Sequence, residues 1–106
     1  MPAPPARLQL RFHKAALKEF SRLEGAAKQA FKKKLEKLVS RAEKPSPKHA
    51  LHGFPPGYYK IKLRRAGLRL VYKYEAENLV ILVVSVGMRE RSIVYQVAKA
   101  RLEGKL

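Results

Sequence analysis

The sequence predicts a small α+β domain in the order β-α-α-β-β-β-α, with a helical hairpin and a C-terminal helix on one face of a small, largely antiparallel sheet. Three observations support this. The hydrophobic period switches between two and about 3.6 residues, strand-like stretches after residue 57 are joined by short turns, and no internal repeat occurs. A chain of 106 residues can bury one core. We therefore expect a single domain over residues 8–106, after a flexible, proline-rich tail at residues 1–7.

The first half of the chain is typical of a strand followed by two helices. Residues 8–12 alternate between apolar and polar side chains, as in a half-buried strand. Residues 13–23 place alanine, leucine and phenylalanine at helical spacing. Gly25 separates this helix from a second one that runs to about residue 42, where prolines follow. We expect a loop over residues 44–57.

The second half is typical of three strands and a helix. Residues 59–64 and 68–74 both alternate, and the glycine-containing turn between them predicts a hairpin. Residues 79–84 are apolar at every position, which predicts a central strand covered on both faces. We expect Gly87 to break this strand, and a helix over residues 92–102 to close the chain.

The composition points to a polyanionic partner. Lysine and arginine number 24 against 8 acids, which gives a net charge of +16. Such an excess is typical of domains that bind nucleic-acid phosphates, and it exceeds what solubility requires. An anionic membrane surface would call for a basic amphipathic helix, a pattern only weakly present. No segment resembles a signal peptide or a membrane span, so we expect a cytoplasmic protein with no membrane partner.

Several chemistries lack the residues they need. The absence of cysteine excludes disulfides, thiolate catalysis and cysteine-ligated zinc. Neither a glycine-rich nucleotide motif nor a paired-carboxylate arrangement occurs, which argues against nucleotide cofactors and metal-dependent hydrolysis. His49 and His52 lie three residues apart without an acidic or cysteine companion, so metal binding there is one hypothesis beside loop or RNA contacts. We expect no cofactor and no metal.

Basic residues that share a face form the candidate site. Successive side chains of a strand point to opposite faces, so Lys60, Lys62 and Arg64 should lie together. Like charges on one face repel each other and lower stability unless they serve a ligand. The hairpin partner strand and the segment after the central strand should add further residues to this concavity: Arg69, Lys73, Arg89, Arg91 and Tyr95.

Two other features have simpler explanations. Lys32, Lys33 and Lys34 span nearly one helical turn, so they cannot share a face, and a solvated surface is expected. Tyr58 and Tyr59 could stack on bases, but alternation places Tyr59 in the core.

Several strings of residues together resemble the RelE family of bacterial and archaeal toxins. They are YKIKLR at 59–64, GLRLVY at 67–72, VSVG at 84–87, and RERS at 89–92 followed by Tyr95. The match extends back to AALKEF at 15–20 and KKKL at 32–35, and covers roughly residues 8–102. Agreement in order and spacing over this length is more specific than any single motif.

The resemblance implies a fold like that of small microbial ribonucleases and a toxin of a type II toxin–antitoxin system. Such a toxin is a metal-independent, ribosome-dependent endoribonuclease, or mRNA interferase, which inhibits translation by cleaving mRNA in the ribosomal A site. The implied partners are mRNA, the 70S ribosome with its 16S rRNA, and a RelB-like antitoxin. Operator DNA would be reached only through the antitoxin complex.

The resemblance also implies a catalytic set of Lys60, Lys62, Arg69, Arg89 and Tyr95, and attack by a ribose 2′-hydroxyl to leave a 2′,3′-cyclic phosphate. Arg69, with Lys60, would stabilise charge on the phosphorane. Either Lys62, its pKa lowered by neighbouring cations, or Tyr95 would accept the proton. Arg89 would stabilise the leaving oxygen, because a guanidinium stays protonated.

Further RNA contacts are expected around this set, from Arg64, Arg65, Lys73, Arg91, Lys32 and Lys33. Met88 departs from the family pattern, since well-known members carry a lysine there. Rival interpretations stay open: a non-catalytic basic module that binds RNA or the ribosome, a gyrase-directed toxin of the same fold, or an inactive relative. The presence of all five catalytic residue types favours cleavage.

Overall fold

The strands and helices follow one another in the predicted order. The computed structural model describes residues 8–41 and 44–104, so the tail predicted at residues 1–7 lies outside the described part. None of the described helices has the length and apolar character needed to cross a membrane. The elements are β1 (Gln9–Phe12), α1 (Lys14–Ser21), α2 (Gly25–Arg41), the 3₁₀ segment η1 (Pro47–His49), β2 (Tyr58–Leu63), β3 (Leu68–Glu75), β4 (Val80–Met88), the 3₁₀ segment η2 (Glu90–Ser92) and α3 (Ile93–Leu102).

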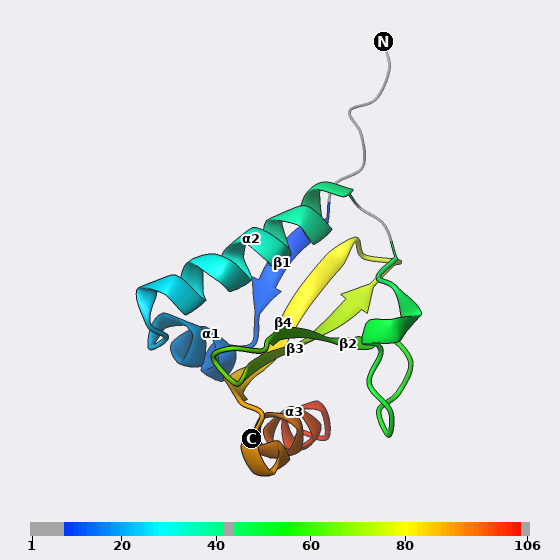
Figure 1. Ribbon diagram of the computed structural model, residues 1–106. Helices are drawn as coiled ribbons and strands as arrows, with labels where there is room; N and C mark the ends of the chain where they lie inside the picture. Colours follow the sequence, from blue (N-terminus) through cyan, green and yellow to red (C-terminus); the bar gives the residue numbers. More distant parts are fainter. Residues whose placement is uncertain (1–7, 42–43, 105–106) are drawn as a thin grey trace.

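The sheet has the order β1-β4-β3-β2, so β3 and β4 are its central strands (Figure 1). β3 pairs antiparallel with both β2 and β4, while the short β1 runs parallel to β4. This confirms the prediction of a largely antiparallel sheet. β2 is an edge strand whose outer side meets only an isolated bridge between Ala50 and Tyr59 among the described residues.

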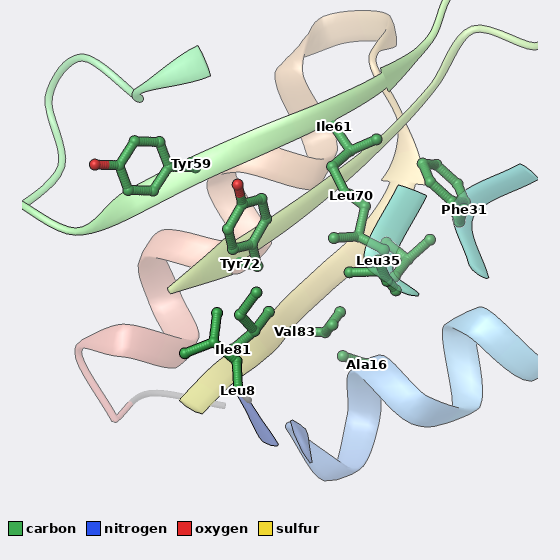
Figure 2. Packing of buried hydrophobic residues seen from close by; sticks show 11 residues of the cluster. Leu8, Ala16, Phe31, Leu35, Tyr59, Ile61, Leu70, Tyr72, Ile81 and Val83 are labelled. Carbon is green, nitrogen blue, oxygen red and sulfur yellow. The ribbon is translucent and has the colours of Figure 1, made fainter. Parts of the chain in front are cut away.

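The helices cover both faces of the sheet, and the expectation of a single covered face was wrong. α1 and α2 lie on one side and α3 on the other (Figure 1). Figure 2 shows the first core, in which Phe31 and Leu35 of α2 pack near Ile61 and Leu70 of the sheet. The second core joins α3 to the opposite face and consists of Tyr58, Val71, Val84, Val94 and Ala98. A strand that is apolar at both parities needs cover on both faces, so α3 must occupy the second one.

β4 continues through Gly87 to Met88, so Gly87 does not break the strand as expected. A side chain at Gly87 would place its Cβ 3.7 Å from the Cβ of Val94, in ordinary contact with the first turn of α3. A Cβ at this position would therefore fit beside α3 without displacing it. Gly25 is also reassigned, because it begins α2 instead of separating the two helices.

A register shift between Val71 and Tyr72 sets which residues of β4 face α3. Val83 and Val86 both belong to the first core, although strict alternation would send them to opposite faces. Val84 belongs to the second core, and Ser85 also faces α3, since its Oγ donates a 2.8 Å hydrogen bond to the carbonyl of Val94. The bulge thus puts Gly87 on the α3 side.

An ion pair ties α1 and α3 to β4. Nη1 and Nη2 of Arg101 donate to the two carboxylate oxygens of Glu19 at 2.8 and 2.9 Å, and Nη1 also donates to the carbonyl of Val84 at 2.8 Å. The backbone N–H of Val86 donates to the same carboxylate at 3.1 Å. Because β1 pairs with β4 only as far as Val83, Glu19 satisfies an N–H that no strand reaches.

Candidate active site

A row of residues crosses the sheet on its α3 side. Lys62 lies opposite Arg69 on β3, and Arg69 lies opposite Gly87 on β4. Lys60 is one step away along β2, opposite Val71 of the second core. The alternation of β2 and β3 therefore places both lysines and Arg69 on one face, as the sequence predicted.

Arg69 is a buried cation without an acidic partner. The residue is only 6% exposed, and its Nη1 donates a 2.8 Å hydrogen bond to the carbonyl of Leu68. Among the described residues no carboxylate forms an ion pair with it. A guanidinium stays charged, and burying an uncompensated charge lowers stability. Such an arrangement indicates a site prepared for an anion.

Lys62 is held in a cluster of like charges. Lys60 contributes most to lowering the pKa of Lys62 below the ordinary lysine value, followed by partial burial and then by Arg64, Arg69 and Arg89. Neighbouring cations act in this direction because they destabilise the charged ammonium. Because the charge of Arg89 also acts on Lys62, the residue that directly follows β4 lies near the row. A lysine with a lowered pKa is suited to accept a proton.

Arg89 is placed by the turn between β2 and β3. Its backbone N–H donates a 2.9 Å hydrogen bond to the carbonyl of Gly67, whose φ of 65° is easily adopted by glycine. The Arg89 side chain is exposed, so its guanidinium can reach a ligand above the row. The chain then enters α3 through Ser92, a non-glycine residue with a φ of 55°. Such backbone strain is often found at functional sites.

Tyr95 lies in the first turn of α3, half-buried against the second core. Its position depends on the hydrogen bond between Ser85 and the carbonyl of the preceding residue, Val94. α3 therefore carries Tyr95 to the face of the sheet that holds Arg69. A catalytic role for Tyr95 stays a prediction.

Lys73 does not join the row, although it shares its face. Its ammonium lies 5.8 Å from the centroid of the Tyr58 ring and 3.7 Å from a carboxylate oxygen of Glu75. Tyr58 is 8% exposed and its ring lies 5.7 Å from that of Phe54, so it is not available to stack on a base. Tyr59 is buried as predicted, stacked on Tyr72 (Figure 2).

The other predicted RNA contacts are spread over the surface. Lys32 and Lys33 are exposed on α2, and Arg65 is exposed in the turn after β2. The side chain of Arg91 lies outside the described part. RNA binding by these residues stays a prediction.

The sequence reading missed a basic groove of about 400 Å³ between α2 and β2. Lys34, Lys37 and Arg41 line its α2 side, and their spacing of three and four residues is the signal that could have revealed a shared helix face. Lys60 and Lys62 line it from β2, so the groove adjoins the row. Within the described part of the chain, no group of three or more His, Cys, Asp or Glu residues could hold a metal ion.

Comparisons with known proteins show which family the chain belongs to. The family model of the ParE toxin of the type II toxin–antitoxin system parDE matches residues 10–93. The chain is 48% identical over 96 residues to a RelE-like toxin protein of Escherichia coli, covering 91% of this chain and 98% of that protein. It is 43% identical over 93 residues to the mRNA interferase toxin RelE of E. coli K12, covering 88% and 95%.

Solved structures show the same relationship. A mutant of E. coli RelE in the free state matches with a TM-score of 0.78 and 39% identity, covering 92% of this chain and 98% of that chain. A chain of the intact E. coli RelBE toxin–antitoxin complex matches with a TM-score of 0.69 and 41% identity, covering 81% and 100%. The protein therefore belongs to the RelE/ParE superfamily of toxins from type II toxin–antitoxin systems.

Proposed function

We propose that this toxin is an endoribonuclease that cleaves mRNA in the A site of the 70S ribosome, beside 16S rRNA. Its catalytic residues are Lys60, Lys62, Arg69, Arg89 and Tyr95. The observation that carries the proposal is the buried guanidinium of Arg69, which lies in a row with Lys62 and forms no ion pair with a carboxylate of the described residues. Supporting it, relatives at this level of identity are named mRNA interferases.

In the proposed reaction a ribose 2′-hydroxyl attacks the adjacent phosphorus, and the bond to the 5′-oxygen breaks. Lys62 accepts the 2′-proton, because crowding by Lys60 and the nearby arginines favours its neutral form. Arg69, with Lys60, donates to the phosphorane oxygens as their negative charge grows. Arg89 stabilises the leaving 5′-oxygen, which takes its proton from water, and the products are a 2′,3′-cyclic phosphate and a 5′-hydroxyl. Tyr95, in the first turn of α3, is the other candidate for accepting the 2′-proton.

A RelB-like antitoxin is the proposed inhibitor, and operator DNA is reached only through that complex. Support comes from solved relatives in complex with RelB. Action on ribosomes places the toxin in the cytoplasm. A site made of charges needs a substrate held in position, and we assign this role to the ribosome.

The function can be tested with purified toxin and ribosomes programmed with a defined mRNA. We expect cuts at the A-site codon, seen by primer extension, and cyclic-phosphate ends on the 5′ fragments. Binding to ribosomes without cuts would instead identify a non-catalytic module. Inhibition of gyrase supercoiling without mRNA cuts would identify a gyrase-directed toxin.

The role of Lys62 predicts a pH dependence. Below the pKa of the base, the cleavage rate should rise with pH, because only neutral Lys62 accepts a proton. Arg64→Ala removes a cation that lowers the pKa of Lys62, so this pKa should rise. At neutral pH the single-turnover rate should then fall about two- to threefold, with the pH profile displaced upward in pH. Arg22→Ala, an exposed change on the far helical hairpin, should leave the profile unchanged. A flat profile between pH 6 and 9 would exclude Lys62 as the base.

A further inference from the structure

The groove between α2 and β2 is not explained by the catalytic set. It contains about 400 Å³, within the range of roughly 300–1,000 Å³ typical of small-ligand sites. Lys34, Lys37 and Arg41 form one wall and Lys60 and Lys62 the other, and no acidic side chain lines it. Like charges that face one another across a groove repel each other, so this arrangement favours an anionic ligand.

The floor of the groove is apolar. Leu38 of α2 and Ile61 of β2 lie there beside Tyr72, whose pKa is raised by burial and then by Tyr59, so its hydroxyl stays neutral. An apolar floor between cationic walls matches a nucleotide, whose base is flat and whose phosphates are charged. A polyanion without a flat apolar group would make no favourable contact with this apolar floor.

His49 lies in the segment η1 and also lines the groove. Partial burial, followed by the charges of Lys48, Lys60, Lys62 and Lys34, lowers its pKa. The imidazole is therefore largely neutral at neutral pH, and a neutral imidazole has both a donor and an acceptor. The lysines and Arg41 can only donate, so His49 adds the ability to accept a hydrogen bond from a base.

We propose that this groove is a second RNA subsite, which binds a nucleotide of single-stranded RNA through the α2 cations on its phosphate and His49 against its base. This inference rests on the proposed function. The row lies on the α3 side of the sheet and the groove on the α2 side, but Lys60 and Lys62 of the edge strand β2 belong to both, so an RNA strand bound at the row can pass over this edge into the groove. That continuity favours RNA over an acidic protein segment. The RNA is either mRNA beside the scissile phosphate or ribosomal RNA.

The subsite can be tested without ribosomes, using fluorescence anisotropy of a single-stranded RNA of about ten nucleotides that carries 2′-O-methyl groups and cannot be cleaved. Lys34→Ala/Lys37→Ala should weaken binding about tenfold. The logarithm of the association constant falls as the logarithm of the salt concentration rises, and this variant should make that slope less negative by about 1.4, or about 0.7 for each lost phosphate contact. Lys14→Ala/Lys18→Ala removes the same charge from exposed positions of α1 and should change affinity less than about twofold. His49→Ala should reduce the differences in affinity among A-, C-, G- and U-rich oligonucleotides.

Equal weakening by the two double variants would overturn the subsite, as would wild-type RNA binding by the groove variant. Loss of antitoxin affinity with unchanged RNA binding would also overturn it and assign the groove to a protein partner. On programmed ribosomes, a lower maximal single-turnover rate in the groove variant identifies mRNA as the ligand. A higher half-saturating toxin concentration with an unchanged maximal rate identifies ribosomal RNA. If the wild-type toxin binds the oligonucleotide but makes no cuts on ribosomes, the proposed function fails and the subsite stands.

Discussion

Arg89→Ala should lower the rate of mRNA cleavage on programmed ribosomes by about 10²–10³-fold, the usual cost of removing one donor to a charge that develops in the transition state. The guanidinium is exposed, and the hydrogen bond that fixes this residue uses its backbone N–H to Gly67. The substitution therefore removes charge beside the leaving oxygen while the turn and α3 keep their places. Single-turnover cleavage at saturating toxin measures the effect.

The matched control is Arg11→Ala, which removes an exposed arginine from β1, at the sheet edge opposite β2. It should cleave within about twofold of the wild type. Arg89→Ala should also keep the wild-type denaturation midpoint and the affinity for antitoxin. Wild-type cleavage by both Arg89→Ala and Tyr95→Phe would show that the catalytic set is wrongly assigned.

Glu19→Ala should lower the free energy of unfolding by about 3 kcal/mol, because it leaves a charged partner without compensation. Arg101 has a side chain only 7% exposed, and its Nε already lacks a hydrogen-bond partner among the described residues. The substitution also leaves the backbone N–H of Val86 without its acceptor. Urea denaturation followed by circular dichroism measures the loss.

Glu36→Ala serves as the control, since this glutamate is exposed on α2, and it should change stability by less than about 0.5 kcal/mol. Adding Arg101→Met to Glu19→Ala should recover part of the loss, because an apolar residue of similar length removes the stranded charge. A Glu19→Ala protein as stable as the control would show that the pair contributes nothing to holding α3.

Much of the fold follows from periodicity because hydrophobic patterns are local. The change from period two to helical spacing after residue 12 correctly placed α1, and the apolar run at 79–84 indicated a strand with two covered faces. The helix positions on the sheet were not predictable in the same way. An apolar pattern in α3 states that one side is buried but not against which face of the sheet, and the expectation of one covered face failed there.

Part of the candidate site was likewise predictable from local patterns, and part depended on packing between distant segments. Alternation alone put Lys60 and Lys62 on one face, and the short hairpin turn brought Arg69 to them. The groove could not be predicted from the sequence, because its walls come from α2 and β2, which are far apart in the chain. The sequence alone predicts a solvated surface at Lys34, and only the packing of α2 beside β2 brings it to the same groove as Lys60 and Lys62.

The sequence by itself determined the order of elements, the excess of positive charge and the shared face of the basic strands, because each depends on neighbouring residues and on strand geometry. Tertiary structure decided the rest. The bulge at Val71 and Tyr72 turned Gly87 toward α3, and the ion pair between Glu19 and Arg101, 82 residues apart, fixed that helix over the row. Contacts of this kind form only when distant segments pack, since no local pattern records which partner a buried group will meet.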